Sequence, residues 1–283
     1  MIREWLDTYH PKDNASAEQA LREIMQEIAL AGLERAGFFE KAAFYGGTAL
    51  RIFYKLPRFS EDLDFSLLAR DDRFSLQSYL DRMQEEFEAL GMRVSVTEKK
   101  KTKQTAVDSA FLKADTTWKE LILQGVIPQE KLGLRPEIKI KIEVDTHPPK
   151  GFSTEEKLMI RPYSFYVKCF SLPDLFAGKM HALLFRKWRD RVKGRDWFDL
   201  EWYIRKGVPL HLEHFKARAQ DSGDWKEKKI SREQLIALLE AKIRDVSFSR
   251  IKEDIIKFIP DDKTVSIWSA KYFIDLIRHL KFC

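Results

Sequence analysis

The sequence predicts an α+β domain followed by a helical domain, with the change near the segment PPKGFSTEEK at residues 148–157. Up to about residue 147, segments in which apolar and polar residues alternate lie between segments with helical spacing. From about Leu172 onward only helical spacing recurs. At 283 residues the chain is long enough for one large domain or two ordinary ones.

The first domain combines both patterns. Residues 16–38 predict a helix, because apolar residues recur at near-helical spacing after Ser16, a residue type that caps helix starts. Residues 41–55 predict a short strand, a glycine turn and a second helix. The same two patterns predict the remaining elements: strands at 58–68, 92–99 and 136–147, and a helix at 76–91 that Gly91 ends.

The second domain is predicted to be built from helices. Five segments have the required apolar spacing: 172–188, 194–204, 231–243, 251–259 and 266–280.

Composition bounds the function. Charged residues make up 33% of the chain, no apolar run approaches the roughly 20 residues of a membrane span, and the N-terminus MIREWLDTYH lacks the layout of a signal peptide. We therefore expect a cytoplasmic protein without a membrane partner. Cys169 and Cys283 lie far apart and receive no function. The net charge of +6 and pI of 9.1 favour polyanionic partners such as nucleic acid or nucleoside triphosphates, although a solvated surface or an acidic protein partner would also account for them.

Two aspartates with one apolar residue between them occur on the strand predicted at 58–68. Side chains at i and i+2 of a strand point the same way, so Asp62 and Asp64 would lie on one face while Leu63 and Phe65 turn to the core. Two parallel carboxylates need a neutralising cation. Mg²⁺ fits, because one or two carboxylates plus substrate phosphates commonly bind it.

A glycine pair precedes these acids. Gly46 and Gly47, at a strand-to-helix turn, would let backbone N–H groups approach an anion at the helix N-terminus, and Thr48 would add a hydroxyl donor. No Gly-Lys-Ser/Thr follows, so this is not a P-loop. Gly-Gly alone is more often a plain turn and Asp-x-Asp a solvated strand edge, but their conjunction indicates a triphosphate site beside a metal site.

The stretch GGTALRIFYKLPRFSEDLDF at residues 46–65 resembles the signature of the nucleotidyltransferase superfamily, specifically the AbiEii/AbiGii group of abortive-infection toxins of bacterial toxin–antitoxin pairs. That group has a Gly-Gly-Thr turn and a Ser-x-Asp-apolar-Asp strand, which here adds Ser60 as a nucleotide-binding candidate. The resemblance implies a small mixed sheet flanked by helices, followed by a helical region. We place the nucleotidyltransferase core at 1–155 and the mainly helical domain at 156–283.

A second block, residues 171–204, is similar to the group's later motifs, in which one helix contributes a lysine and a basic loop precedes an Arg-Asp-x-aromatic-Asp-Leu helix start. The resemblance implies catalytic roles for Lys179 and Asp196 and phosphate binding by Lys179 and Arg186, with Arg195 and Asp199 beside them. Helix caps and structural ion pairs are the alternative for Arg195, Asp196 and Asp199. We keep Asp199 closer to the structural interpretation.

The superfamily usually supplies a third carboxylate from a later strand. Glu143 and Asp145 both fit the strand predicted at 136–147, and we prefer Glu143 as the third metal ligand with Asp62 and Asp64. Either acid could instead form a salt bridge with Lys139 or Lys141 on the same face.

These features predict a nucleotidyltransferase that uses Mg²⁺, or Mn²⁺ in its place, to move a nucleoside monophosphate from an NTP to an acceptor hydroxyl. Resemblance to the toxin group points to an RNA acceptor, such as a tRNA 3′ end, and to a cognate antitoxin protein; a protein acceptor stays open. The alternative is a catalytically inactive module of the same fold that binds a nucleotide or an antitoxin.

Overall fold

The structure is a computed structural model that describes residues 1–92, 94–98, 107–114, 138–186, 193–259 and 261–283. Its contacts divide the chain into two compact units, each discontinuous in sequence. Unit 1 comprises residues 1–49, 59–148 and 156–169, and unit 2 comprises residues 50–58, 149–155 and 170–283. The domain boundary that the sequence analysis places after residue 155 instead gives two domains that are each continuous in sequence.

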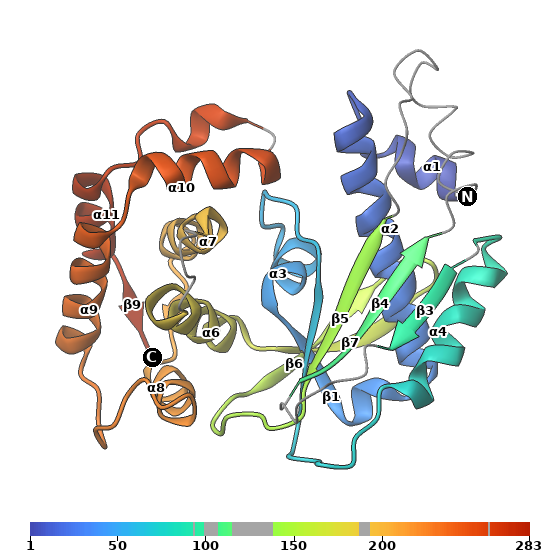
Figure 1. Ribbon diagram of the computed structural model, residues 1–283, viewed down its shortest axis with the longest axis horizontal. Helices are drawn as coiled ribbons and strands as arrows, with labels where there is room; N and C mark the ends of the chain where they lie inside the picture. The colour runs from blue at the N-terminus through green and yellow to red at the C-terminus, as the bar shows by residue number, and fades with distance from the viewer. Residues whose placement is uncertain (93, 99–106, 115–137, 187–192, 260) are drawn as a thin grey trace. The chain divides into compact units, whose positions relative to one another are not determined.

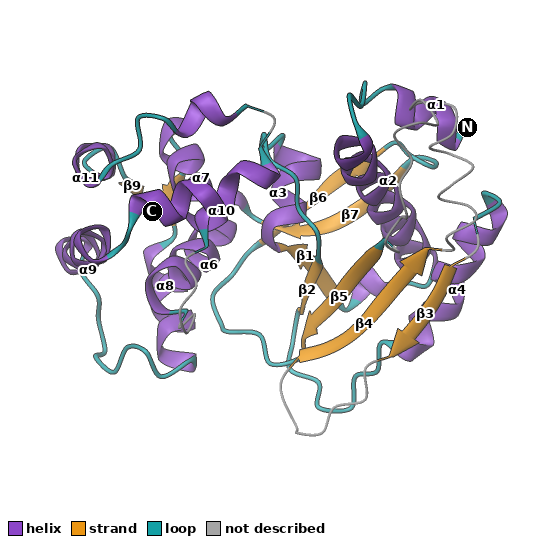
Figure 2. Ribbon diagram, turned by 45° about the horizontal axis from the view of Figure 1, so that its top comes forward, coloured by secondary structure: helices purple, strands orange, loops and turns teal. Residues whose placement is uncertain are grey.

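Unit 1 contains a mixed sheet of seven strands (Figures 1 and 2). The strand order is β3-β4-β5-β2-β1-β7-β6. Strands β1 and β2 are antiparallel, whereas β2 and β5 are parallel, as are β1 and β7. The strands are β1 (Ala42–Tyr45), β2 (Leu63–Leu67), β3 (Val94–Glu98), β4 (Val107–Ala114), β5 (Lys139–Asp145), β6 (Thr154–Met159) and β7 (Phe165–Phe170).

Helices α1 (Ile2–Asp7), α2 (Asn14–Arg35) and α4 (Gln77–Ala89) belong to the same unit, with the short 3₁₀ helix η1 (Phe38–Glu40) after α2. Helix α2 starts earlier than the sequence predicts: Asp13 is the N-cap, and its side chain accepts a hydrogen bond from the backbone N–H of Ser16. Ser16 is therefore the third helical residue of a capping box and not the cap. The N-cap is thus the aspartate three residues before the serine that the sequence analysis expected.

Strand β2 is anchored by aromatic packing. Leu63 and Phe65 are fully buried, as their alternation predicts. The Phe65 ring lies 4.9 Å from that of Phe38 in η1 and 5.1 Å from that of Phe44 in β1. Such contacts add to the burial energy of each ring, so this face of β2 has a fixed orientation and its acidic face is turned the other way.

Unit 2 is helical, apart from a two-stranded parallel sheet of β8 (Pro209–Leu210) and β9 (Lys281–Phe282). Helix α6 packs against α7, α8 and α9. The C-terminal part of α3 (Gly46–Tyr54) also belongs to this unit. The helices are α6 (Leu172–Phe185), α7 (Gly194–Arg205), α8 (Leu212–Asp221), α9 (Arg232–Asp245), α10 (Phe248–Ile255) and α11 (Ala270–Ile277), with 3₁₀ helices η3 (Ile256–Phe258) and η4 (Asp262–Val265).

The predicted fold class, a mixed sheet flanked by helices and followed by helices, is confirmed. The sequence analysis missed strands β4, β6 and β7, the two-residue strands β8 and β9, and helices α1 and α8. Strand β6, of sequence TEEKLM, ends the sheet, so most of its side chains are exposed or half-buried and its apolar pattern is weak. Only its place at the edge of the sheet makes it recognisable as a strand.

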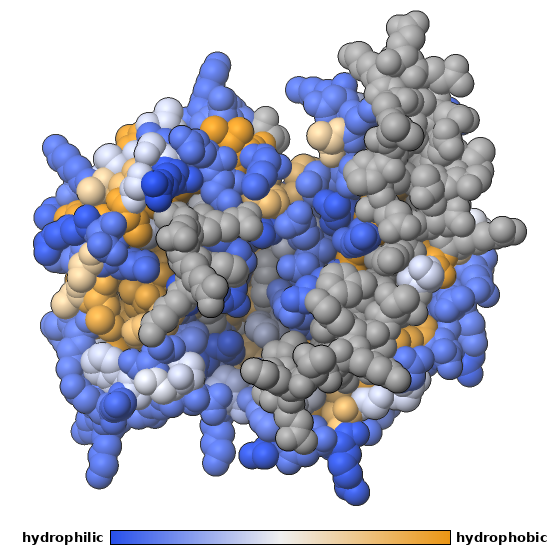
Figure 3. Space-filling model, in the orientation of Figure 1, coloured by the Kyte–Doolittle hydropathy of each residue, from blue (hydrophilic) through white to orange (hydrophobic). Residues whose placement is uncertain are grey.

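Hydrophilic residues cover most of the described surface seen in Figure 3, as expected for a chain with 33% charged residues. Among the described helices, none combines the length with the apolar composition that a bilayer span would need.

Candidate functional site

The turn between β1 and α3 lies against an aspartate. Gly46 has a φ of +83°, a conformation that side chains other than glycine rarely adopt. A Cβ atom at Gly46 would lie 2.2 Å from Oδ2 of Asp64. The glycine thus allows the first turn of α3 to approach the Asp64 carboxylate, which brings together two of the predicted site residues. No strand-to-helix loop intervenes, since α3 begins where β1 ends.

Backbone hydrogen bonds hold the chain that leads into β2. The Thr48 hydroxyl, which is fully buried, donates to the backbone oxygen of Asp62. The Gln26 side chain of α2 donates to the backbone oxygens of Ser60 and Glu61, both at 3.1 Å. Thr48 therefore fixes the start of the acidic strand, and nucleotide contacts by Thr48 and Ser60 stay predictions.

Strand register brings a third carboxylate beside the acid pair. Asp64 is paired with Glu143 across the parallel strands β2 and β5, while Asp145 is paired with Ser66. The side chains of paired residues on neighbouring strands project to the same face of the sheet. Asp64 and Glu143 therefore lie next to each other on one face. Asp62 lies immediately before β2, two residues from Asp64. The register thus distinguishes the two acids that the sequence left as alternatives.

The Glu143 carboxylate forms an ion pair with Lys141 on the same strand, as one of the sequence-based alternatives anticipated. Both side chains are about one-third exposed. Across the residues that the structure describes, no group of three or more His, Cys, Asp and Glu side chains is gathered closely enough to hold a metal ion. The donors fit Mg²⁺ in the form in which one or two carboxylates, here Asp64 and Glu143, share the ion with substrate phosphates.

In unit 2, Lys179 of α6 contacts Asp199, the aspartate that the sequence analysis kept closer to the structural interpretation. Its Nζ atom lies 2.8 Å from Oδ2 of Asp199. Asp199 also accepts two hydrogen bonds of 2.6 Å from Arg58, through Nε to Oδ1 and Nη2 to Oδ2. Arg58 is 1% exposed and Asp199 is completely buried.

The charges around Asp199 keep it ionised. Burial favours the neutral acid, but the positive charges of Arg58 and Lys179, together with their hydrogen bonds, outweigh it and lower the pKa of Asp199. The structural interpretation of Asp199 thus has a specific partner, Arg58, for which the sequence offered no signal beyond a lone arginine in a loop.

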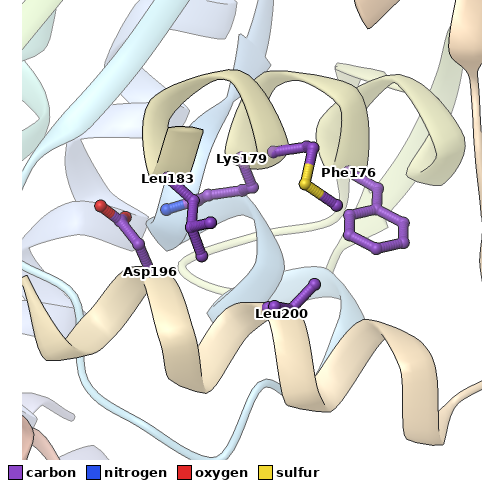
Figure 4. Close-up of a pocket in the computed structure, with 6 residues that line it drawn as sticks. Phe176, Lys179, Leu183, Asp196 and Leu200 are labelled. Carbon is purple, nitrogen blue, oxygen red and sulfur yellow. The ribbon is translucent and has the colours of Figure 1, made fainter. Parts of the chain in front are cut away.

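Asp196 lies one turn earlier on α7 and is almost completely buried. With Lys179 it lines a small pocket between α6 and α7 that the apolar side chains of Phe176, Met180, Leu183 and Leu200 complete. Figure 4 shows the Lys179 side chain extending toward the side of the pocket where the Asp196 carboxylate lies, with Phe176 at the other end. The two predicted residues of the second block therefore share one pocket.

The sequence analysis missed one cation that interacts electrostatically with Asp196, namely Lys193. Burial lowers the pKa of Lys193 to about 8; Asp196 opposes the shift, and the charges of Arg186, Arg195 and Lys179 add to it. Lys193 immediately precedes α7, and its backbone oxygen accepts from the N–H of Asp196 at 3.2 Å. The charge on Lys193 would be favoured by an anion, which is the property expected of a phosphate ligand.

The two remaining basic positions lie on either side of a segment outside the described residues. Arg186 is the exposed C-cap of α6, and the basic loop that the resemblance implies falls largely on residues 187–192. The guanidinium of Arg195 lies 4.2 Å from the centre of the Phe258 ring, a cation–π contact that fits the structural interpretation of that arginine.

A Gly-Gly-Thr turn that opens a helix, an adjoining acidic strand and a third acid on the next strand, all within a mixed α+β fold, define a protein of the nucleotidyltransferase class. The model of the nucleotidyl transferase AbiEii toxin family, of type IV toxin–antitoxin systems, matches residues 28–275. The chain belongs to this family.

Two solved structures from Helicobacter pylori are similar to this chain. One is described as a candidate nucleotidyltransferase, with 18% identity, 90% of each chain covered and a TM-score of 0.48. The other is JHP933, with 15% identity, 92% of this chain and 93% of that chain covered, and a TM-score of 0.45. No protein with curated annotation matches the sequence.

Proposed function

We propose that this protein is a Mg²⁺-dependent toxin that transfers a nucleoside monophosphate from an NTP to an acceptor hydroxyl of an RNA. The acceptor oxygen bonds to the α-phosphorus, the bond from that phosphorus to the bridging oxygen breaks, and pyrophosphate leaves with the electron pair. The hydroxyl proton passes to a nearby carboxylate. Mg²⁺, or Mn²⁺, would neutralise the phosphate charge; Asp64 and Glu143 would hold it together with the substrate phosphates, and Asp62 would join them once the ion is bound.

Each candidate residue has a role that its chemistry suits. Backbone N–H groups at Gly46 and Gly47, at the start of α3, are suited to a phosphate oxygen. Lys179, Lys193 and Arg186 are suited to the remaining triphosphate charge, and Asp196 to orienting a donor or the acceptor hydroxyl.

One observation supports the proposal most: the Asp64 carboxylate lies both at the glycine turn and beside Glu143. Two neighbouring carboxylates repel each other unless a cation joins them, and a metal-bound triphosphate supplies that cation together with an anion that the helix start favours. Family membership supports the same reaction class.

The test is incubation with each α-³²P-labelled NTP, Mg²⁺ and either total RNA or a protein extract. The wild type should label a distinct acceptor in a Mg²⁺-dependent manner, and chelation with EDTA should stop it. Asp64→Asn and Lys179→Met, one variant from each unit, should both lose the labelling while remaining folded. If the wild type labels nothing with any NTP, the proposed reaction is wrong.

A second candidate is a catalytically inactive module that binds a nucleotide or an antitoxin. The ion pair of Glu143 with Lys141 favours it, because an ammonium can neutralise that carboxylate in place of a metal. In that case NTP binding would persist in EDTA and no transfer would occur.

A further inference from the structure

The Lys179 ammonium is held by a carboxylate that cannot easily turn. Arg58 binds both oxygens of Asp199 at 2.6 Å, and this two-point contact fixes the plane of the carboxylate. The Asp199 oxygen that accepts from Nη2 of Arg58 is the one that lies 2.8 Å from Nζ of Lys179. The position of the lysine charge is therefore set by a buried pair behind it.

The cluster of Arg58, Asp199 and Lys179 carries a net positive charge. Two cations and one carboxylate give Arg58, Asp199 and Lys179 a net charge of +1 when all three are ionised. With Asp199 and Lys179 alone, the carboxylate would cancel the lysine. An ammonium has three N–H donors, and the bond to Asp199 uses one of them, so the others can point to phosphate oxygens.

We propose that Asp199 is a positioning residue, which holds the Lys179 ammonium for the triphosphate while Arg58 balances its charge. This inference rests on the proposed function for the identity of the ligand. Asp199 acts through Lys179 and makes no contact with the nucleotide itself. Arg58 has the structural role that Asp199 alone was expected to have.

The test uses the full-length chain and compares Asp199→Asn with Asp254→Asn. Asp254 is a matched control, because its carboxylate accepts the N–H of Gly194 at 2.9 Å and so also supports α7, through the helix backbone and not through Lys179. Two quantities are measured: the affinity for Mg²⁺–NTP by calorimetry, and the rate at which limiting acetic anhydride labels Lys179 relative to the exposed Lys206, read by peptide mass spectrometry.

Asp199→Asn should weaken NTP binding at least about tenfold and speed the relative labelling of Lys179 several-fold, because a charge-assisted hydrogen bond is lost. Asp254→Asn should leave both unchanged. In the Lys179→Met background, Asp199→Asn should cause no further loss of affinity, since a residue that acts through Lys179 has nothing left to position. Multiplicative losses in that double variant, or unchanged labelling of Lys179, would overturn the inference.

Two further results are interpretable: a failure of Asp199→Asn to fold, and a failure of the wild type to bind NTP. If Asp199→Asn does not fold, Arg58→Met with Asp199→Asn removes the unpaired charge, and the same labelling and affinity results are expected of that variant; Arg58→Met alone should keep Lys179 protected. If the wild type binds no NTP, the proposed function is wrong, and the labelling of Lys179 still decides whether Asp199 positions it.

Discussion

Asp64 and Glu143 are directly paired residues of the parallel strands β2 and β5, whereas Asp145, two residues further along β5, is paired with Ser66. The pairing places one of two otherwise equivalent acids next to the carboxylate that lies against the glycine turn. The choice of the third metal ligand is thereby open to a direct test.

We predict that Glu143→Gln lowers nucleotidyl transfer by about 100-fold or more, since loss of a metal ligand removes several kcal/mol of transition-state stabilisation. Asp145→Asn is the matched control on the same strand, and it keeps the oxygen that accepts from the N–H of His147. Activity and Mn²⁺ affinity, the latter by electron paramagnetic resonance, are the measurements. A loss in Asp145→Asn with none in Glu143→Gln would reverse the assignment.

Gly46→Ala should destabilise unit 1 by more than Gly91→Ala and should also abolish transfer. Both glycines have positive φ, of +83° and +73°, so both substitutions carry a strain of about 1–2 kcal/mol. Only at Gly46 would the new Cβ meet an atom, Oδ2 of Asp64, whereas Gly91 has open space. Urea denaturation followed by far-UV circular dichroism compares the two, and equal losses of stability would show that Asp64 moves aside freely.

Removing Asp199 should cost more stability than removing Asp196. Asp199→Ala leaves the Arg58 guanidinium buried without its carboxylate, which we expect to lower the free energy of unfolding by about 3–5 kcal/mol. Arg58→Met combined with Asp199→Leu should recover most of the loss. Tryptophan fluorescence reports on unit 2 through the buried Trp197, Trp202 and Trp268. An unchanged midpoint in Asp199→Ala would contradict the buried pair.

NTP affinity should depend on pH through Lys193. Its pKa of about 8 means that it is charged below pH 8 and neutral above it, so an anion that needs the charge binds more weakly as the pH rises, by up to about tenfold per pH unit. Lys193→Arg, which stays charged, should flatten this dependence, and Lys193→Met should bind weakly at every pH. Titration of Mg²⁺–NTP between pH 7 and 10 measures it. The same slope in the wild type and Lys193→Met would exclude Lys193 as the cause.

Stability of unit 1 should fall as the pH rises toward neutrality. Burial, opposed by Arg161 at 2.8 Å, raises the pKa of Glu27 from 4.5 to about 7. Between these values the folded state holds a proton that the unfolded state has lost, so the free energy of unfolding decreases with pH through this window, by at most about 3 kcal/mol. Glu27→Gln should remove this dependence in urea denaturation at pH 5, 6 and 7.5; an identical pH slope would show that other groups cause it.

The sequence by itself determined the parts of this protein that depend on local spacing. Gly46 and Gly47 mark the turn between β1 and α3, and at Gly46 a positive φ and a close approach to Asp64 require glycine. The two-residue period of a strand predicted one face for Asp62 and Asp64, of which Asp64 lies within β2 and Asp62 immediately before it, and the helical spacing around Lys179 identified α6. Each of these relationships is fixed within a few residues of the chain.

Tertiary structure decided which distant residues meet. The register of β2 on β5 selected Glu143 over Asp145 as the neighbour of Asp64, and packing within unit 2 placed Arg58 and Asp199 in contact and out of water. A charged residue in a loop looks the same in the sequence whether it ends up solvated or buried, because its environment is made by segments far away in the chain. The strand β6, whose exposed residues leave little apolar periodicity, was recognisable only from its place at the sheet edge.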